Sequence, residues 1–198
     1  LERDCDNGED EELNCDKIPN GGLCDCENGW CGWQNTGKAI MDWSLNTGAT
    51  PTDKTGPQFD HTFQHTNKSG YYLFVNMNQH FDDPEKKTSA GFASNAVINS
   101  VTFNPPPPCH SNSSSPYSNT CTARLYVHQY GPNPGSINVS VVEMKLKENI
   151  TTTLWWSSKS PYDKWQRVEV VLPNITSKYF FQIEARKGMR IYSDVGID

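Results

Sequence analysis

Short stretches of alternating, β-branched or aromatic residues recur along most of the chain and constrain its fold more than any other feature. No stretch of about eleven or more residues keeps the period near 3.6 of an amphipathic helix, so the sequence predicts strands and no helices. Clusters of Gly, Pro and Asn separate the stretches. The expected strands are Ile40–Leu45, Tyr71–Met77, Ala93–Phe103, Thr122–Tyr130, Ile137–Leu146, Thr152–Trp156, Trp165–Leu172, Tyr179–Ala185 and Arg190–Val195.

Alternation within the strands indicates which side chains face a core, because neighbouring residues of a strand point to opposite faces. In Ile137–Leu146 the apolar phase slips by one residue, which predicts a β-bulge near Val141 and leaves Asn138 on the outer face. About nine antiparallel strands predict an all-β fold, a β-sandwich of the jelly-roll type. The residues expected to point inward are Ala123, Leu125 and Val127 in one strand and Phe181, Ile183 and Ala185 in another.

The cysteines and glycosylation motifs indicate an extracellular chain. Seven cysteines and five Asn-x-Ser/Thr motifs in one domain are typical of the oxidising secretory route. The odd number of cysteines means that at least one has a free, intermolecular or missing partner. Zinc is the alternative for Cys24, Cys26 and Cys31, but no second close pair of Cys or His accompanies them. The glycosylation motifs begin at Asn67, Asn112, Asn138, Asn149 and Asn174.

The distribution of charge excludes two classes of partner. The net charge is -6, and residues 1–12 alone carry seven acidic residues and one basic residue. The rest of the chain has no basic patch, so neither nucleic acid nor an anionic membrane surface is an expected partner. No apolar run approaches the roughly 18–20 residues that span a bilayer. No signal peptide opens the chain, so we expect a piece of a larger protein whose membrane anchor lies outside this sequence.

Catalysis is not expected of this chain. The sequence has no Gly-x-Ser-x-Gly motif, phosphate-binding loop or dinucleotide fingerprint. His61 and His65 are four residues apart, which would place both side chains on one face of a helix, as a metal site could use. They lie in an expected loop or strand instead, so a metal role is not favoured. Residues 104–120 contain a run of four prolines and are expected to form a polyproline II rod followed by a solvated insertion.

Sugar binding is a second hypothesis, because sugars stack on exposed aromatic side chains. The competing interpretation places these aromatic side chains in the core. Two or more exposed tryptophans on one face of a sheet would favour sugar binding. The candidates are Trp155, Trp156, Trp165, Tyr71 and Tyr72.

The acidic opening of the chain, residues 1–16, resembles the end of an LDL-receptor class A repeat. The residues that match the family pattern are Asp4, Cys5, Gly8, Asp10, Glu11 and Cys15. Closely spaced carboxylates of this family bind Ca²⁺ through hard oxygen ligands. The resemblance therefore implies that Asp4, Asp10 and Glu11 belong to a partial calcium cage. It also implies that Cys5 and Cys15 pair with cysteines outside the chain.

After a linker at residues 17–21, residues 22–198 resemble a MAM domain. The matching segments are Cys24–Trp33, Gly56-Pro57, Asp60-His61-Thr62, Gly70–Val75, Cys121–Gly131 and Val195–Asp198. The resemblance implies a jelly-roll sandwich with a Cys24–Cys31 disulfide. It also implies a last strand and a final cysteine beyond Asp198, which leaves the partner of Cys121 outside the chain unless Cys121 pairs with Cys109. Cys26 and Cys109 are additional to the family pattern, and we expect them to pair with each other.

The same resemblance implies a structural cation. MAM-type jelly rolls can hold one where the first and last strands meet. The candidate ligands in this chain are Glu27, Asp60 and Asp198. The alternative interpretation is that these residues are scattered surface carboxylates.

The order of the two modules, joined through Lys17-Ile18-Pro19, is similar to the ectodomain of anaplastic lymphoma kinase receptors. The insertion at residues 104–120 makes the chain more similar to an invertebrate member. This resemblance implies a non-catalytic extracellular module of a single-pass receptor tyrosine kinase, whose kinase domain lies outside this chain. Such a module at the plasma membrane would organise the receptor, associate with itself, or contact a protein ligand or co-receptor. The alternative is an adhesion or spacer module of a protein with several MAM and LDL-receptor class A repeats. Calcium and N-linked glycans are the implied non-protein components.

Overall fold

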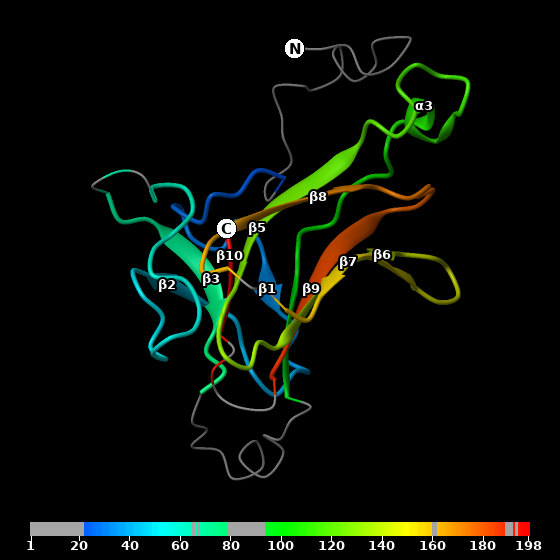
Figure 1. Cartoon of the computed structure of the whole chain (residues 1–198). Helices are drawn as coiled ribbons and strands as arrows, with labels where there is room; N and C mark the ends of the chain where they lie inside the picture. The colour runs from blue at the N-terminus through cyan, green and yellow to red at the C-terminus, as the bar shows by residue number, and fades with distance from the viewer. Residues whose placement is uncertain are drawn as a thin grey trace.

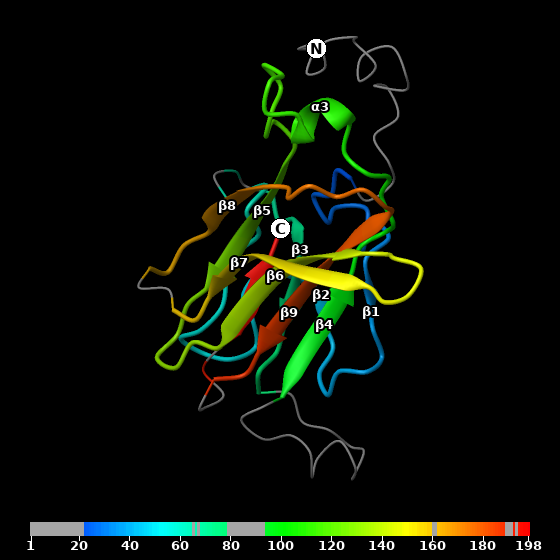
Figure 2. The ribbon, with the colours of Figure 1, turned by 90° about the vertical axis from the view of Figure 1, so that its right-hand side faces the viewer.

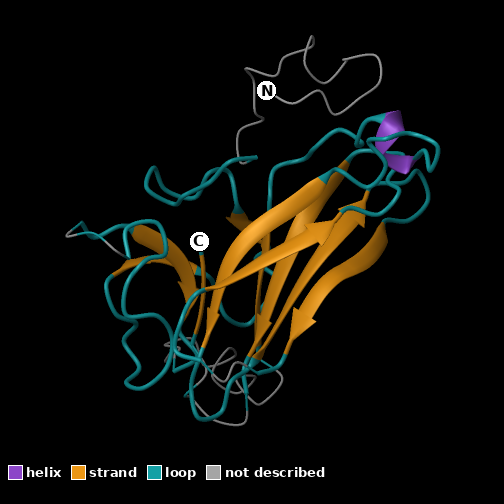
Figure 3. Cartoon of the chain, turned by 45° about the horizontal axis from the view of Figure 1, so that its top comes forward, coloured by secondary structure: helices purple, strands orange, loops and turns teal. Residues whose placement is uncertain are grey.

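The computed structural model describes residues 22–64, 66, 68–78, 94–159, 162–188, 192 and 194–198. In this part of the chain, two five-stranded antiparallel sheets lie against each other with an apolar core between them (Figures 1 and 3). The predicted all-β sandwich is confirmed. The predictions that lie outside the described residues concern Asp4, Cys5, Asp10, Glu11, Cys15, the linker at 17–21, His65 and Asn67.

Each sheet mixes strands from distant parts of the chain, as a jelly roll requires. Sheet A has the order β1-β4-β9-β6-β7, and sheet B has the order β2-β3-β10-β5-β8. Figure 2 looks onto sheet A, with β4, β9, β6 and β7 side by side. The strands of sheet A are β1 (Gln34–Asn35), β4 (Asn95–Asn99), β9 (Tyr179–Arg186), β6 (Ser136–Glu143) and β7 (Ile150–Ser157). The strands of sheet B are β2 (Ser44–Thr47), β3 (Tyr71–Val75), β10 (Val195–Ile197), β5 (Thr122–Gln129) and β8 (Gln166–Val171).

The short strand β10 lies in the middle of sheet B and joins segments that are far apart in sequence. Val195 pairs with Val75 of β3 on one side and with Gln129 of β5 on the other. The ladder continues one residue further, because the backbones of Asp198 and Tyr126 exchange hydrogen bonds of 2.9 and 3.0 Å. This pairing fixes the position of Asp198 at the end of the sheet.

The main core forms where the two sheets face each other, and it confirms both predicted inward faces. Val127 of β5 and Ile183 of β9 are buried there, and Leu125 packs against the same cluster. Phe181 packs against a second cluster around Val141. Burial of side chains of this size stabilises the fold by about 1.5–3 kcal/mol each, so this core is the main source of stability.

The outer face of sheet B carries a second apolar layer. Tyr72, Phe74 and Trp165 form a buried cluster there, and Tyr126 packs against it. The indole N–H of Trp165 donates to the carbonyl oxygen of Phe59 at 2.9 Å, which ties the loop containing Phe59 to the sheet. Sheet B is therefore buried on both faces over part of its area.

Beside this layer, a buried histidine makes the stability of the protein depend on pH. His128 is 3% exposed, and burial lowers its pKa below the ordinary value of 6.5, although the nearby Asp163 carboxylate acts in the opposite direction. The unfolded chain then takes up the proton first as the pH falls. The contribution of His128 to the free energy of unfolding is therefore fully present above about pH 6.5. It is lost as the pH falls towards the pKa of His128 in the folded protein.

We expect His128 to lower the free energy of unfolding in urea between about pH 7 and pH 5 in the wild-type protein. The variant His128→Gln should lack this contribution, so its stability should fall less, or rise, over the same range. The variant Asp163→Asn should show a steeper fall, because the carboxylate 3.2 Å from His128 Nε2 favours the charged ring. Equal pH dependence in the wild type and in His128→Gln would contradict this account.

The insertion at residues 104–120 differs from its prediction, because it folds onto the sandwich. It contains the short helix α3 (Pro108–Ser111), whereas the sequence predicts no helix. The ring of His110 is 1% exposed. Its Nδ1 accepts from the Cys121 N–H at 3.3 Å, so Nε2 donates to the carbonyl oxygen of Leu172 at 2.8 Å. These two bonds hold the helix against the ends of β5 and β8.

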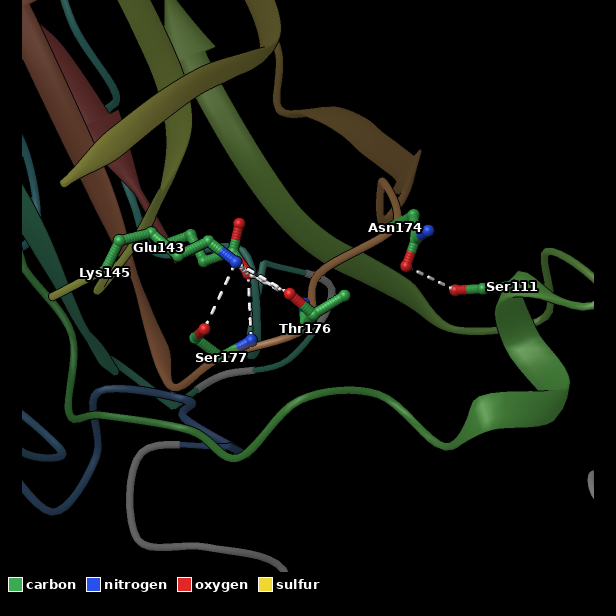
Figure 4. Close-up of polar contacts among 6 residues, drawn as sticks. All are labelled: Ser111, Glu143, Lys145, Asn174, Thr176 and Ser177. Atoms are coloured by element: carbon green, nitrogen blue, oxygen red, sulfur yellow. Dashed lines mark hydrogen bonds and ion pairs between the residues drawn. The ribbon is translucent and has the colours of Figure 1, made fainter. Parts of the chain in front are cut away.

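Polar contacts also hold the loop between β8 and β9 (Figure 4). Ser111 Oγ donates to Asn174 Oδ1 at 2.9 Å. The carboxylate of Glu143, at the end of β6, accepts the backbone N–H groups of Thr176 and Ser177 at 2.7 and 2.8 Å. A hydrogen bond from Lys145, supported by these two, holds the pKa of Glu143 below its usual value of 4.5. The loop is therefore fixed from both of its sides.

The predicted bulge near Val141 is confirmed in its position along β6, but the partner strand carries the extra residue. The irregularity lies between Val139 and Ser140, which pair with Trp155 and Thr153, so the extra residue is Leu154 of β7. Strand β6 itself pairs without interruption with β9. The apolar phase slip arises because Val142, on the outer face, is 5% exposed and so is buried like the inward residues.

Candidate cation site and glycosylation sites

Two of the three predicted cation ligands meet at Gly70. Asp60 is 1% exposed, and its two oxygens accept the N–H groups of Gly70 and Phe63 at 2.8 and 2.6 Å. Glu27 Oε1 accepts the N–H of Tyr71 at 2.8 Å. A Cβ atom placed on Gly70 would lie 2.4 Å from Glu27 Oε1 and 2.6 Å from Asp60 Oδ2. The absence of a side chain at Gly70 is therefore what lets the two carboxylates approach each other.

The third predicted ligand, Asp198, lies beside this pair. Its Oδ2 accepts the N–H groups of His61 and Thr62 at 2.9 and 3.0 Å. Its Oδ1 is buried and has no hydrogen-bond partner. Burial raises the pKa of Asp198 to about 6, and the neighbouring charge of Asp60 adds to this effect. A positive charge near Oδ1 would favour the ionised form.

The three carboxylates supply the hard oxygen donors that Ca²⁺ prefers, and the buried Oδ1 of Asp198 fits such an ion. In the described part of the chain, however, no three Asp, Glu, His or Cys side chains stand close enough together to hold a metal ion. Glu27 and Asp60 are already together.

The cysteines follow the family pattern at one pair and depart from the prediction at another. Cys24 and Cys31 form a disulfide, as the resemblance implied. Cys26 is a free thiol, 3% exposed, in the main core. Its burial, with a smaller contribution from the Asp198 carboxylate, raises its pKa to about 12. Cys109, in α3, is disulfide-bonded, so the predicted Cys26–Cys109 pair is wrong. Cys26 is enclosed between the sheets, while Cys109 lies in the insertion beyond them.

The four described glycosylation motifs lie at sheet A and around α3. Asn138 is on the outer face of β6, and Asn149 lies in the connection between β6 and β7. Asn112 follows α3, and Asn174 lies in the neighbouring loop that contacts it. Asn112, Asn149 and Asn174 are exposed, and Asn138 is half-buried. No strand of sheet B carries a motif among these residues.

The predicted sugar-binding aromatics do not form a common platform. Trp165 is 8% exposed and Tyr72 is fully buried, both in the layer over sheet B. Trp155 packs against the main core. Trp156 is 59% exposed on sheet A, and Tyr71 is 41% exposed on sheet B. Of the three candidate tryptophans, one is therefore exposed, and the two exposed candidates lie on different sheets.

The two sheets and the disulfide near the start of the described chain define a disulfide-bonded β-sandwich module. Residues 24–198 match the family model described as "MAM domain, meprin/A5/mu", and the chain belongs to the MAM domain family. MAM domains are non-catalytic, extracellular modules of multi-domain proteins and mediate protein interactions. No helix in the described residues is long and apolar enough to cross a membrane.

Similar proteins include longer proteins that share this module. The chain is 26% identical over 185 residues to thyroid hormone-induced protein B of Xenopus laevis, covering 92% of this chain and 23% of that protein. It is 22% identical over 179 residues to neuropilin-1a of Danio rerio, covering 87% and 17%. The chain thus spans about a fifth of the length of these relatives.

Two solved structures are similar in fold. A carbohydrate-binding module of the β-sandwich superfamily matches with a TM-score of 0.46 at 12% identity, covering 88% of this chain and 58% of that one. Xylanase 10B of Clostridium thermocellum matches with a TM-score of 0.41 at 11% identity, covering 84% and 25%.

Proposed function

We propose that this chain is a protein-association module in the ectodomain of a single-pass receptor, and that two copies contact each other through sheet B. The resemblance of residues 1–16 and of the linker favours a receptor of the anaplastic lymphoma kinase kind, with its membrane anchor and kinase domain outside this chain. The module would then organise the receptor at the outer side of the plasma membrane.

The observation that carries this proposal is that no strand of sheet B contains a glycosylation motif among the described residues. A surface that bears several glycans cannot form a tight protein interface, because the glycans hold a partner away. Asn138 and Asn149 lie in and beside sheet A, while Asn112 and Asn174 lie around α3, at one end of β5 and β8. The part of sheet B away from that end is therefore the surface left for a partner. Asn67, between Thr66 and Lys68 in the sequence, lies outside the described residues.

The chemistry of the β8 edge suits a second copy of the chain. β8 is an edge strand of sheet B, and the unpaired backbone groups of such an edge can pair with another strand. Its exposed face carries both charges, since Glu169 lies 3.5 Å from Arg124 and also contacts Arg167. Val171, on the same strand, is 49% exposed. A two-fold contact repeats one surface on both partners, and a surface with both charges and an apolar residue is complementary to itself.

We also propose that Ca²⁺ binds between Glu27, Asp60 and Asp198. The support is the contact of the first two carboxylates at Gly70 and the buried, unpartnered Oδ1 of Asp198. Because Asp198 follows β10 and Glu27 precedes β1, the ion would join the two ends of the described sandwich. It would stabilise the end of sheet B next to the proposed contact surface.

A glycan placed on the β8 edge tests the association. Arg167→Asn with Glu169→Thr creates a glycosylation motif at two exposed positions. Thr151→Asn is the matched control, because it moves the Asn149 motif two residues along the exposed β7 strand of sheet A. Both proteins are made in a glycosylating secretory host and examined by sedimentation velocity. We expect the first variant to be monomeric and the control to dimerise like the wild type. Equal dimerisation of both variants would exclude the β8 edge.

The alternative is an adhesion or spacer module of a protein with several MAM and LDL-receptor class A repeats. A wild-type chain that stays monomeric at all concentrations would favour the spacer. The carbohydrate-binding alternative has less support, because Trp156 is the exposed tryptophan of the three candidates and its neighbour Asn138 is itself a glycosylation motif.

A further inference from the structure

On the outer face of sheet A, a glycosylation site and an exposed tryptophan stand directly opposite each other. Asn138 of β6 pairs in register with Trp156 of β7 on one side and with Glu184 of β9 on the other. Residues paired in this way have Cβ atoms about 4.5–5.5 Å apart and point to the same face. Trp156 is 59% exposed, so a large apolar ring lies uncovered next to the glycosylation site.

These residues line a hollow in the sheet. The hollow has a volume of about 360 Å³ and is lined by Ser136, Asn138, Trp156, Glu184 and Arg186. Its floor is polar, because Arg186 Nε lies 3.1 Å from Glu184 Oε1 and Asn95 Nδ2 donates to the same oxygen at 2.6 Å. One wall is thus an aromatic ring, and the floor carries charged donors and acceptors.

We infer that the glycan on Asn138 folds back into this hollow, with its first N-acetylglucosamine lying against the indole ring of Trp156. The Oδ1 atom of Asn138 is buried. The sugar is attached to the other atom of the side-chain amide, the nitrogen Nδ2. Transfer from a lipid pyrophosphate donor forms the bond between Nδ2 and sugar C1, and the amide loses one proton as the lipid pyrophosphate leaves. The sugar is then covalently held beside Trp156.

Tethering makes this contact favourable. A free monosaccharide loses translational and rotational freedom on binding, but a sugar already attached next to its site does not lose it again. The C–H face of the pyranose covers the exposed apolar ring, and its acetamido and hydroxyl groups face the charged floor. The contact closes the hollow to free sugars and to protein partners. This inference does not depend on the association through sheet B.

The direct test is NMR of the chain made in a glycosylating host with ¹³C-labelled glycans and trimmed to one N-acetylglucosamine per site. Mass spectrometry first measures occupancy at Asn138. We expect high occupancy and one set of sugar resonances shifted upfield by the indole ring. These shifted resonances should disappear in Trp156→Ala and in Asn138→Gln, but they should persist in Asn149→Gln. An unoccupied Asn138, or no upfield-shifted sugar that depends on Trp156, would overturn the inference.

A thermal stability cycle gives an independent readout. We expect Trp156→Ala to lower the Tm of the glycosylated protein by about 2–4 °C. In the Asn138→Gln background, the same substitution should leave the Tm unchanged within error, because Trp156 is then an exposed side chain without a partner sugar. Equal effects of Trp156→Ala in both backgrounds would show that the ring packs on protein alone and would contradict the inference.

Discussion

Replacing Gly70 with alanine is expected to destabilise the protein and to abolish its response to Ca²⁺. The new methyl group would lie 2.4 Å from Glu27 Oε1 and 2.7 Å from Asp60 Cγ. Glu27 can swing away, but Asp60 is buried and held by the N–H groups of Gly70 and Phe63. Overpacking of this kind costs about 1–3 kcal/mol, or roughly 2–10 °C in Tm. The separated carboxylates can then no longer share an ion.

Thermal unfolding with Ca²⁺ and with chelator measures both effects. The control is Gly48→Ala, where an added Cβ meets no atom within 4 Å and only the left-handed φ of 70° opposes the change. That cost is about 1 kcal/mol, and this variant should keep the wild-type rise of Tm with Ca²⁺. If Gly70→Ala melts at the wild-type temperature, the close approach of Glu27 and Asp60 to Gly70 does not contribute to stability. If it keeps the Ca²⁺ response, the proposed ion does not bind there.

The second large effect is expected from Trp43→Ala in the main core. Trp43 is 1% exposed and packs in the cluster between the sheets. The side chain of Asn35 holds its backbone by two hydrogen bonds, of 2.9 Å to its N–H and 3.0 Å to its carbonyl oxygen. Removing a buried tryptophan costs about 3–5 kcal/mol, so we expect a Tm lower by roughly 6–20 °C.

Two comparison variants make this prediction specific. Trp43→Phe should cost much less than Trp43→Ala, because the indole nitrogen of Trp43 is buried without a hydrogen-bond partner and no bond is lost. Tyr162→Ala removes an aromatic ring that is 59% exposed, and it should change stability by no more than about 0.5 kcal/mol. Chemical unfolding curves measure all three. A Trp43→Ala protein as stable as Tyr162→Ala would contradict the assignment of Trp43 to the core.

Most of the sandwich could be predicted from the sequence where one face of a strand is buried and the other is not. The alternation around Leu125 and Ile183 shows this, and both residues lie on the predicted faces. Prediction was poorer where both faces are covered. In β10 the sequence places a strand at Arg190–Val195, while the structure has Val195–Ile197, all buried. A strand of three buried residues, one of them glycine, has no alternation to detect.

Contacts between distant segments explain the other differences. β1 has two residues and forms by pairing with β4, so it leaves no periodic pattern. The α3 insertion looks solvated from its composition, but His110 anchors it through Leu172, which is far away in sequence. For Glu27 and Asp60, only the family resemblance indicated that the two carboxylates meet. Their approach depends on the absence of a Cβ at Gly70, which strand periodicity does not reveal. The pairing of Asn138 with Trp156 depends on the register of β6 and β7, which the sequence did not reveal.

The most direct test of the proposed function is the mass of the wild-type chain in solution. The glycosylated protein is examined by size exclusion with light scattering over a range of concentrations, with Ca²⁺ and with chelator. We predict a monomer that becomes a dimer as the concentration rises, and a weaker dimer in chelator, because the ion stabilises the end of sheet B. A monomer at every concentration, with and without Ca²⁺, would contradict association through sheet B.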